Sequence, residues 1–202
     1  QWVKFKTKLN LKDINFIPSN KTEYKYIELV DIGKTGDIKS CTYAKGIELP
    51  SRARRKVNAN DVIISSIEGS LESCAFVTEE YNNALCSTGF YVINSDKINS
   101  ETLLVLFKSE PMQNILKQNC SGTILTAINK QDILNIPVPL IEKKVQLKIK
   151  EKISESFELK KESEHLLDTA KGAVEIAIEQ NETEAINYIN QNIKKNDKTG
   201  IE

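Results

Sequence analysis

Apolar residues in the first two thirds of the chain gather in short runs that polar or Gly-containing segments separate. Runs of this length that are rich in β-branched and aromatic residues predict β-strands. They are YKYIELVDI at 24–32, VIISSI at 62–67, CAFVT at 74–78 and FYVIN at 90–94. We therefore expect a sheet-containing domain in this part of the chain.

Helical patterns interrupt these runs at two places. The segment 100–119 predicts a helix with Ser100 as its N-cap, which Pro111 kinks or divides. A shorter helical turn at 129–135 precedes the extended sequence IPVPL at 136–140. Strands mixed with a few helices, without regular alternation, indicate an α+β fold. We predict a mixed-sheet domain over residues 1–140.

The pattern changes at about residue 141. Residues 141–180 contain no Pro, one Gly and abundant Glu and Lys, which predicts one helix of roughly 40 residues and about 60 Å. Residues 181–202 are expected to form one short helix at EAINYIN and then to fray.

The second half of the long helix carries an apolar stripe. Its small and apolar residues recur at alternating spacings of 4 and 3, which is typical of a coiled-coil seam, and small residues let two helices approach closely. The predicted helix-pairing residues are Leu159, Leu166, Leu167, Ala170, Ala173, Val174 and Ala177. A partner helix is the leading interpretation, and folding back on its own domain is the alternative.

Composition limits the class of protein. An apolar content of 40% and a charged content of 28% are typical of globular proteins. The formal net charge is zero, so any nucleic-acid binding requires a local basic patch. No apolar run is long enough for a membrane span or a secretory signal, so we expect a cytoplasmic protein.

Signals for catalysis fail when they are tested one by one. The four cysteines lack the short spacings of a zinc site and are expected to be free thiols. The GKT sequence at 33–35 has Glu28 where a phosphate-binding loop needs Gly. The single histidine, His165, lies in the helical segment and supports no nucleophile–base arrangement. We predict a non-catalytic chain with no metal and no cofactor.

All three arginines of the chain lie in the stretch PSRARRKV at 50–57. Residues 45–56 hold five basic residues and one acid, whereas 61–80 hold five acids and no base. In an extended strand Arg52 and Arg54 would project from one face and Arg55 from the other. Arginine offers a planar donor fork that suits phosphate or guanine. The alternative is that the arginines pair with the neighbouring acids and hold the domain together.

Two longer stretches resemble the specificity (S) subunit of bacterial type I restriction–modification enzymes. They are PSRARRKVNANDVIISSIEGSLESCAFV and CSGTILTAINKQDILNIPVPLIEKKVQ, and the second leads into the long helix. The family's Ser-Gly-Thr corresponds to 121–123, its "IP-P" to 136–139, and the Gln that opens the spacer helix to Gln146. Asn60 replaces the usual Gly of a turn, and Asn also takes a left-handed conformation.

The resemblance implies a DNA-recognition domain on a rigid helix, with catalysis supplied by other subunits. Modification subunits would bring S-adenosylmethionine and methylate adenine, and restriction subunits would bring ATP-driven translocation and cleavage. The expected partners are double-stranded DNA and these two kinds of subunit. The predicted DNA-contacting residues are Arg52, Arg54, Arg55 and Lys56, then Lys34 and Lys45, with Ser121 and Thr123 as contact or turn residues.

A full S subunit has two recognition domains and two spacer helices, and this chain shows one of each. We expect either a C-terminal fragment or a half-length form that dimerises through the long helix. Two other interpretations stay open. One is a coiled-coil adaptor that binds protein, and the other is a DNA-modifying enzyme of the same defence systems.

Overall fold

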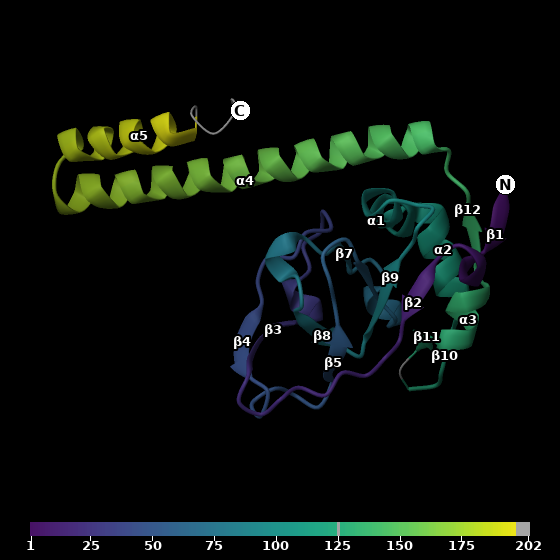
Figure 1. Cartoon of the computed structure of the whole chain (residues 1–202). Coiled ribbons are helices and arrows are strands. Elements are labelled where there is room, and N and C mark those ends of the chain that lie inside the picture. Colours follow the sequence, from purple (N-terminus) through teal and green to yellow (C-terminus); the bar gives the residue numbers. More distant parts are fainter. Residues whose placement is uncertain (125, 197–202) are drawn as a thin grey trace. The chain divides into compact units, whose positions relative to one another are not determined.

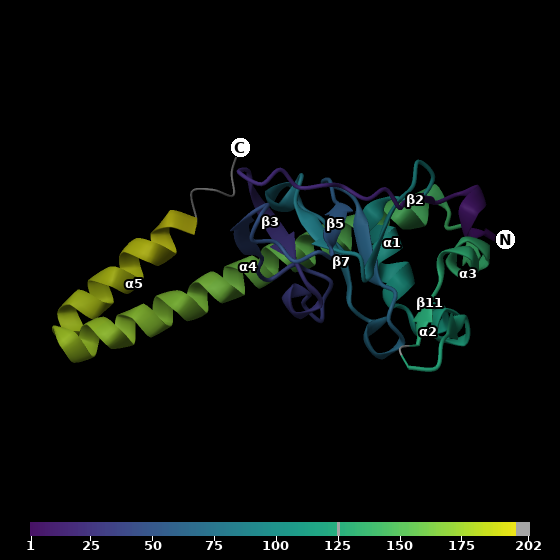
Figure 2. The same cartoon turned by 90° about the horizontal axis from the view of Figure 1, so that it is seen from below.

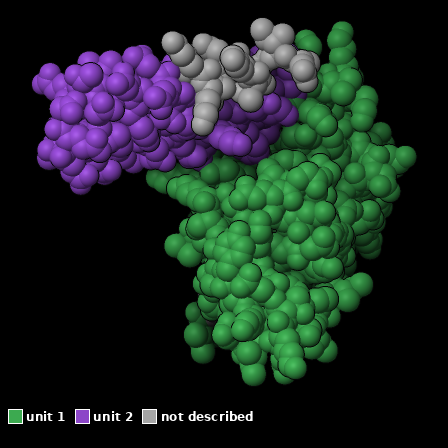
Figure 3. All heavy atoms as spheres, turned by 60° about the vertical axis from the view of Figure 1, so that its left-hand side comes forward, with its two compact units in different colours: residues 1–150 green, residues 151–202 purple. Residues whose placement is uncertain are grey.

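The structure is a computed structural model, and it describes residues 1–124 and 126–196. The chain divides into two compact units, residues 1–150 and residues 151–202, which Figure 3 shows in different colours. Unit 1 contains the sheets, and unit 2 is helical in its described part.

Two four-stranded sheets form the framework of unit 1 (Figure 1). Sheet I has the order β2 (Asn10–Lys12), β9 (Phe90–Asn94), β6 (Val62–Ser65) and β7 (Cys74–Phe76), and all its pairings are antiparallel. Sheet II has the order β4 (Thr42–Lys45), β3 (Glu23–Ile27), β8 (Leu85–Ser87) and β5 (Ala53–Lys56). Its β3–β8 pair is parallel and its other pairs are antiparallel, so sheet II is mixed.

The two sheets share one apolar core. Sheet II contributes Ile27 and Cys86, and sheet I contributes Ile63, Phe90 and Val92, all at most 1% exposed. Alternation along β6 turns its other side chains toward α1 (Ser100–Lys108), which packs against β6 and β7. Sheet I is therefore covered on both faces, which explains why VIIS is apolar without interruption.

Smaller elements close the end of unit 1. Helix α2 (Glu110–Gln118) follows α1 directly and has Pro111 in its first turn, so the predicted division of this segment is confirmed. The N-cap of α1 is Asn99, whose side chain accepts a hydrogen bond from the Thr102 amide at 2.9 Å. The prediction of Ser100 as the cap is wrong by one residue, and Ser100 instead donates to the Asn60 carbonyl. Asn60 has a φ of 69°, the left-handed conformation that was expected.

Two short antiparallel pairs and α3 (Lys130–Asn135) complete the unit. β1 (Trp2–Lys4) pairs with β12 (Pro137–Pro139), which brings the two ends of the sheet-containing region together. β10 (Cys120–Ser121) pairs with β11 (Ala127–Ile128). The Asn129 side chain caps α3 by accepting hydrogen bonds from the amides of Gln131 and Asp132.

The long helix α4 (Lys143–Glu179) has 37 residues, close to the prediction. Its beginning is fixed within unit 1 by Gln146, which is 2% exposed. The Gln146 side chain accepts from the Asn99 amide at 3.0 Å and donates to the carbonyls of Lys97 and Ile141 at 3.0 and 2.8 Å. Since Asn99 also caps α1, a single polar network joins the first turns of α1 and α4.

Helix α5 (Glu182–Asn196) turns back along the end of α4 within unit 2 (Figures 1 and 2). The Asn181 side chain accepts from the Glu184 amide at 2.9 Å and so caps α5. Ala173 on α4 and Ala185 on α5 are buried. Helix α5 is longer than the predicted EAINYIN, and the predicted frayed end at 197–202 lies outside the described residues.

The α+β fold class, with mixed sheets and a long C-terminal helix, is confirmed. Among the described residues, no helix combines the length and the apolar character that a membrane crossing requires.

Candidate nucleic-acid interface

The basic stretch forms β5, the edge strand of sheet II. Residues 13–16 lie along its open side: Asn15 bridges to Arg55, and the Phe16 amide donates to the Arg54 carbonyl at 2.7 Å. The register of β5 against β8 shifts between Ala53 and Arg55, which marks a β-bulge at this point. The expected simple alternation of Arg52, Arg54 and Arg55 therefore does not hold, because the bulge redirects the side chains.

Arg55 is engaged inside unit 1. Its side chain is 15% exposed and forms an ion pair with Asp13, and its Nη1 donates to the Asn15 side chain at 2.9 Å. Asp13 also pairs with Lys130 of α3 at 2.7 Å. Arg55 thus joins β5, residues 13–16 and α3. This is the alternative left open by the sequence, in which an arginine pairs with an acid and holds the domain together. The partner acid is Asp13 and not one of the acids at 61–80.

Arg52 lies just before β5, and its side chain is more exposed than that of Arg55. Its Nη2 donates to the Glu28 carboxylate and its Nε to the Tyr26 hydroxyl at 3.3 Å, while 59% of its side chain is exposed. The hydrogen bond with Glu28 raises the pKa of Arg52 above its ordinary value, and burial raises the pKa of Tyr26. The guanidinium is therefore charged and fixed in direction.

The Arg52–Glu28 pair lines a hollow of about 390 Å³. The rest of the lining comes from the 3-10 turn η2 (Leu29–Asp31), from the end of β8 and the residues after it, and from Ile67. The lining residues besides the pair are Leu29, Val30, Ile67, Ser87, Thr88 and Gly89. The hollow thus combines a fixed cation and a fixed anion with apolar and hydroxyl groups.

Arg54 and Lys56 are the least constrained cations of β5. The Arg54 Nε donates to the Ser51 carbonyl at 2.8 Å, and no partner for its terminal nitrogens is found among the described residues. The Lys56 Nζ lies 5.5 Å from the centre of the Phe16 ring, a weak cation–π contact at an exposed side chain. Both can turn toward a phosphate without breaking an ion pair.

Lys45 and Lys34 lie elsewhere on unit 1. Lys45 ends β4, which forms the opposite edge of sheet II, with β3 and β8 between it and β5. Lys34 is exposed in the turn at 33–36. The structure therefore does not bring these two lysines to the edge that carries the arginines.

Ser121 ends β10 and Thr123 lies in the β10–β11 connection; both are exposed, and Gly122 between them has a φ of 132°. Backbone contacts link this connection to the Arg52 side of the unit. The Glu68 amide donates to the Thr126 carbonyl at 2.9 Å, the Ser66 amide to the Gly89 carbonyl at 2.8 Å, and the Thr88 amide to the Arg52 carbonyl at 2.9 Å. Figure 1 shows β5 and β10–β11 on the same lower side of unit 1.

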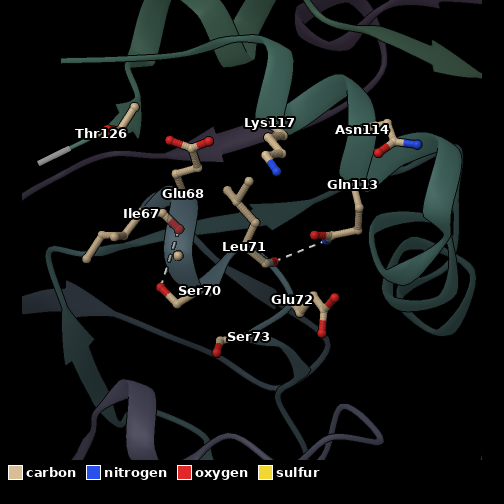
Figure 4. Close-up of a pocket in the computed structure, with 11 residues that line it drawn as sticks. Ile67, Glu68, Ser70, Leu71, Glu72, Ser73, Gln113, Asn114, Lys117 and Thr126 are labelled. Carbon is tan, nitrogen blue, oxygen red and sulfur yellow. Dashed lines mark hydrogen bonds between the residues drawn. The ribbon is translucent and has the colours of Figure 1, made fainter. Parts of the chain in front are cut away.

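A second cavity of about 870 Å³ lies on the other side of Ile67 (Figure 4). It opens between the η3 turn (Glu68–Ser70) and one face of α2. Figure 4 shows Lys117 extending from α2 into the space between Glu68 and Gln113. The Gln113 amide is fixed because it donates to the carbonyls of Leu71 and Phe107 at 3.1 and 2.6 Å.

Sequence reasoning missed Glu28 and Asp13, the partners of Arg52 and Arg55. It also missed Lys130, which pairs with Asp13, and Lys117, which lines the second cavity. Glu28 is 24 residues from Arg52 and Asp13 is 42 residues from Arg55, so no local pattern could have paired them. The one available signal was the concentration of arginine itself.

The predicted helix-pairing residues fall into two groups. Leu159, Leu166, Leu167 and Val174 are between 43% and 59% exposed, and Ala170 is also exposed. Ala173 is buried and Ala177 half-buried, on the side of α4 nearer to α5. A Cβ added at Gly172 would lie 3.0 Å from the Tyr188 hydroxyl, so α5 approaches α4 closely there. Most of the stripe is therefore left open by α5.

The four cysteines are free. Burial raises the pKa of the Cys74 thiol to about 12 and raises that of Cys86 further. Burial also raises the pKa values of Cys41 and Cys120. The thiols are therefore protonated at neutral pH and are poor nucleophiles. Among the described residues, no group of three His, Cys, Asp or Glu side chains is placed to hold a metal ion.

The solved structures that this fold resembles are specificity subunits of type I restriction–modification systems, so the resemblance noted from the sequence is confirmed at the level of the fold. One similar structure is the HsdS subunit from Thermoanaerobacter tengcongensis, with 25% identity, a TM-score of 0.66, and coverage of 87% of this chain and 49% of that one. Another comes from a study of complex assembly and conformational transition of the type I R-M system, with 27% identity, a TM-score of 0.66, and coverage of 84% and 46%.

The S subunit from M. genitalium shares the fold, with a TM-score of 0.54, 13% identity, and coverage of 89% of this chain and 44% of that one. No protein-family model matches the sequence, and no curated protein is significantly similar to it. The chain spans about half the length of the structures that it matches. This agrees with a half-length piece.

Proposed function

We propose that this chain is the DNA-recognition part of a type I restriction–modification complex. It reads one half of a bipartite target, and it docks the DNA-adenine methyltransferase subunits without catalysing a reaction itself. The observation that carries the proposal is the similarity of fold over 84% and 87% of the chain to specificity-subunit structures of such systems. S-adenosylmethionine and ATP would be bound by the modification and restriction subunits.

The edge of sheet II supports DNA as the ligand. Arg54 and Lys56 have charged groups that can reach a phosphate, and contacts of this kind set the position of a protein on the duplex. Arg52 and the β10–β11 connection lie on the same side and can reach base edges. Because the net charge is zero, binding by this edge depends on a few local contacts.

The experiment that tests DNA binding compares Arg54→Ala with the unchanged chain in a salt titration. Removal of one phosphate contact lowers the affinity and reduces the slope of log K against log salt by about 1. The matched control is Lys39→Ala, which removes one positive charge from an exposed residue outside β5. Equal affinity and equal slope in Arg54→Ala and in the unchanged chain would contradict the proposed contact.

We propose that the apolar stripe of α4 pairs with a second helix, either from a second copy of this chain or from another recognition domain. Leu159, Leu166, Leu167 and Val174 are exposed side by side at helical spacing, which favours burial in a helix pair. In sedimentation experiments, the double change of Leu166 and Leu167 to Glu is expected to shift a dimer to monomer. Lys161 lies about 140° or more around the helix from Leu159 and Leu166, so the variant Lys161→Glu serves as the control.

Docking of the methyltransferase is tested by isolating the tagged chain from its host and identifying what purifies with it. Recovery of a DNA-adenine methyltransferase that becomes active on DNA only with this chain is the expected result. Recovery of unrelated proteins instead would favour the second candidate, a coiled-coil adaptor. The observation in favour of that candidate is the same exposed stripe, together with the zero net charge.

A further inference from the structure

The three arginines differ in how many of their donors are already used. A guanidinium has five N–H donors in a fixed fork. Both terminal nitrogens of Arg55 are engaged, by Asp13 and Asn15, and its side chain is largely buried. Among the described residues, Arg54 is held through its Nε alone. Arg52 is intermediate, because Nε and Nη2 are held while no partner for Nη1 is found among the described residues.

Glu28 is fixed as firmly as Arg52. Its carboxylate accepts from the Asp31 amide, and the Asp31 carboxylate accepts from the Glu28 amide at 2.8 Å, which forms a reciprocal cap on η2. The Glu28 side chain is still 32% exposed. A carboxylate has lone pairs beyond those used by Arg52 and Asp31, so Glu28 can accept another hydrogen bond.

Arg52 and Glu28 therefore present a donor and an acceptor side by side in the lining of the hollow of about 390 Å³. In the major groove, a G·C pair presents the acceptors O6 and N7 of guanine next to the N4 amino donor of cytosine. Arginine is the usual partner of guanine O6 and N7, and glutamate accepts from cytosine N4. The donors of Arg52 and the neighbouring acceptor Glu28 are thus complementary to the guanine acceptors and the neighbouring cytosine donor of one base pair.

We propose that Arg52 and Glu28 act as one unit that reads a single G·C base pair. Arg52 donates to guanine, and Glu28 accepts from the cytosine of the same pair. An A·T pair keeps the N7 acceptor but replaces guanine O6 by an amino donor and the cytosine amino donor by the thymine O4 acceptor. A reversed pair exchanges donor and acceptor, so either change leaves a donor of Arg52 or the Glu28 carboxylate without a partner. Because Tyr26 and Asp31 hold the two side chains beforehand, little ordering is needed on binding.

This inference rests on the proposed DNA-recognition function, so its test begins with the unchanged chain. A pool of double-stranded DNA with a randomised central segment is passed over this chain, and the bound fraction is sequenced. The enriched duplex is then remade with each base pair replaced in turn, and the affinity for every duplex is measured. The same series is repeated with Glu28→Gln, Arg52→Lys and Glu48→Gln.

Glu28→Gln keeps an oxygen that can accept from the Asp31 amide, and Arg52→Lys keeps the charge but lacks the planar fork. Glu48→Gln removes one negative charge from an exposed residue outside the hollow and is the matched control. Equal melting temperatures of all four proteins establish that each variant is folded. If Glu28→Gln is destabilised, Arg52→Lys carries the test alone.

The expected result is one G·C position whose replacement weakens binding by the unchanged chain about tenfold. That penalty disappears in Glu28→Gln and Arg52→Lys and persists in Glu48→Gln. An enriched target whose base-pair penalties are the same in all four proteins overturns the inference and leaves the proposed function intact. If the unchanged chain enriches no sequence, the proposed function itself fails.

Discussion

Unit 1 buries most of its large apolar side chains between its own sheets and helices, whereas the described part of unit 2 fully buries none of its own. Phe5, Phe90, Phe107 and Ile63 of unit 1 are at most 1% exposed. In unit 2 the buried apolar residues that the structure describes are Ala173 and Ala185. Seven large ones are exposed, namely Leu159, Leu166, Leu167, Val174, Ile178, Ile186 and Ile193, and others such as Phe157 and Ile176 are half-buried.

The difference shows what apolar periodicity can and cannot tell. In both units the pattern marks a face that favours burial. In unit 1 the covering element comes from the same chain, as when α1 covers β6. In unit 2 α5 approaches α4 closely at Gly172, and Leu159, Leu166 and Leu167 stay exposed. The pattern therefore predicts a buried face but not the molecule that buries it.

The largest expected effect is on the free energy of unfolding, and it distinguishes a core position of unit 1 from an exposed position of unit 2. Phe90→Ala removes a ring from the core that sheets I and II share, and we expect it to lower the free energy of unfolding by about 3–5 kcal/mol. Leu167→Ala, at a side chain that is 57% exposed, should change it by less than about 0.5 kcal/mol. Urea unfolding at low protein concentration measures both. A cost above 2 kcal/mol for Leu167→Ala would show that α4 is already covered.

The elements that sequence patterns predicted are those with a strong local signal. The apolar runs at β6 and β9, the division at Pro111 and the 37-residue α4 all follow from neighbouring residues. The prediction of strand over 24–32 is right only in part, because β3 ends at Ile27 and η2 follows. At Glu28 the reciprocal cap with Asp31 turns the backbone, and that cap depends on polar side chains, not on apolar periodicity.

The candidate site was harder to predict because its partners are distant in sequence. The residues ARRK form β5 only because Leu85–Ser87 pairs with them, and β-propensity alone would not place a strand there. Sequence reasoning located the arginines but could not distinguish Arg55, which is locked to Asp13, from Arg52, which borders a hollow. That distinction depends on tertiary contacts.

The next prediction concerns Gln146, where α4 begins within unit 1. Gln146→Ala removes three side-chain hydrogen bonds at a buried site, and at about 1 kcal/mol each the loss of stability is about 3 kcal/mol. Thermal unfolding measures it, with Lys148→Ala at an exposed position of the same helix as the control. A near-zero effect would mean that water replaces the amide without loss, and that α4 is held by other contacts.

A smaller effect is expected inside unit 2. Gly172→Leu places a side chain where Tyr188 now lies, and such overpacking costs about 2 kcal/mol. Since unit 2 has little core to spare, hydrogen exchange of the α5 amides should accelerate while exchange in sheet I stays unchanged. Lys171→Leu, at an exposed neighbouring position, is the control. Equal protection of α5 in both variants would indicate that Tyr188 moves aside.

The smallest expected effect is a pH dependence of the free energy of unfolding, and it again distinguishes the two units. Burial raises the pKa of Cys74 from 9.0 to about 12 and that of Tyr81 from 10.0 to about 12, and both lie in unit 1. Since the folded pKa is above the unfolded one, the stability of unit 1 is fully present below about pH 9 and is lost as the pH rises from 9 toward 12. At pH 10 the Cys74 thiol alone should account for about 1 kcal/mol. Cys74→Ala should make the unfolding free energy flatter between pH 8 and about pH 10, and an unchanged slope would show that the thiol does not titrate with unfolding.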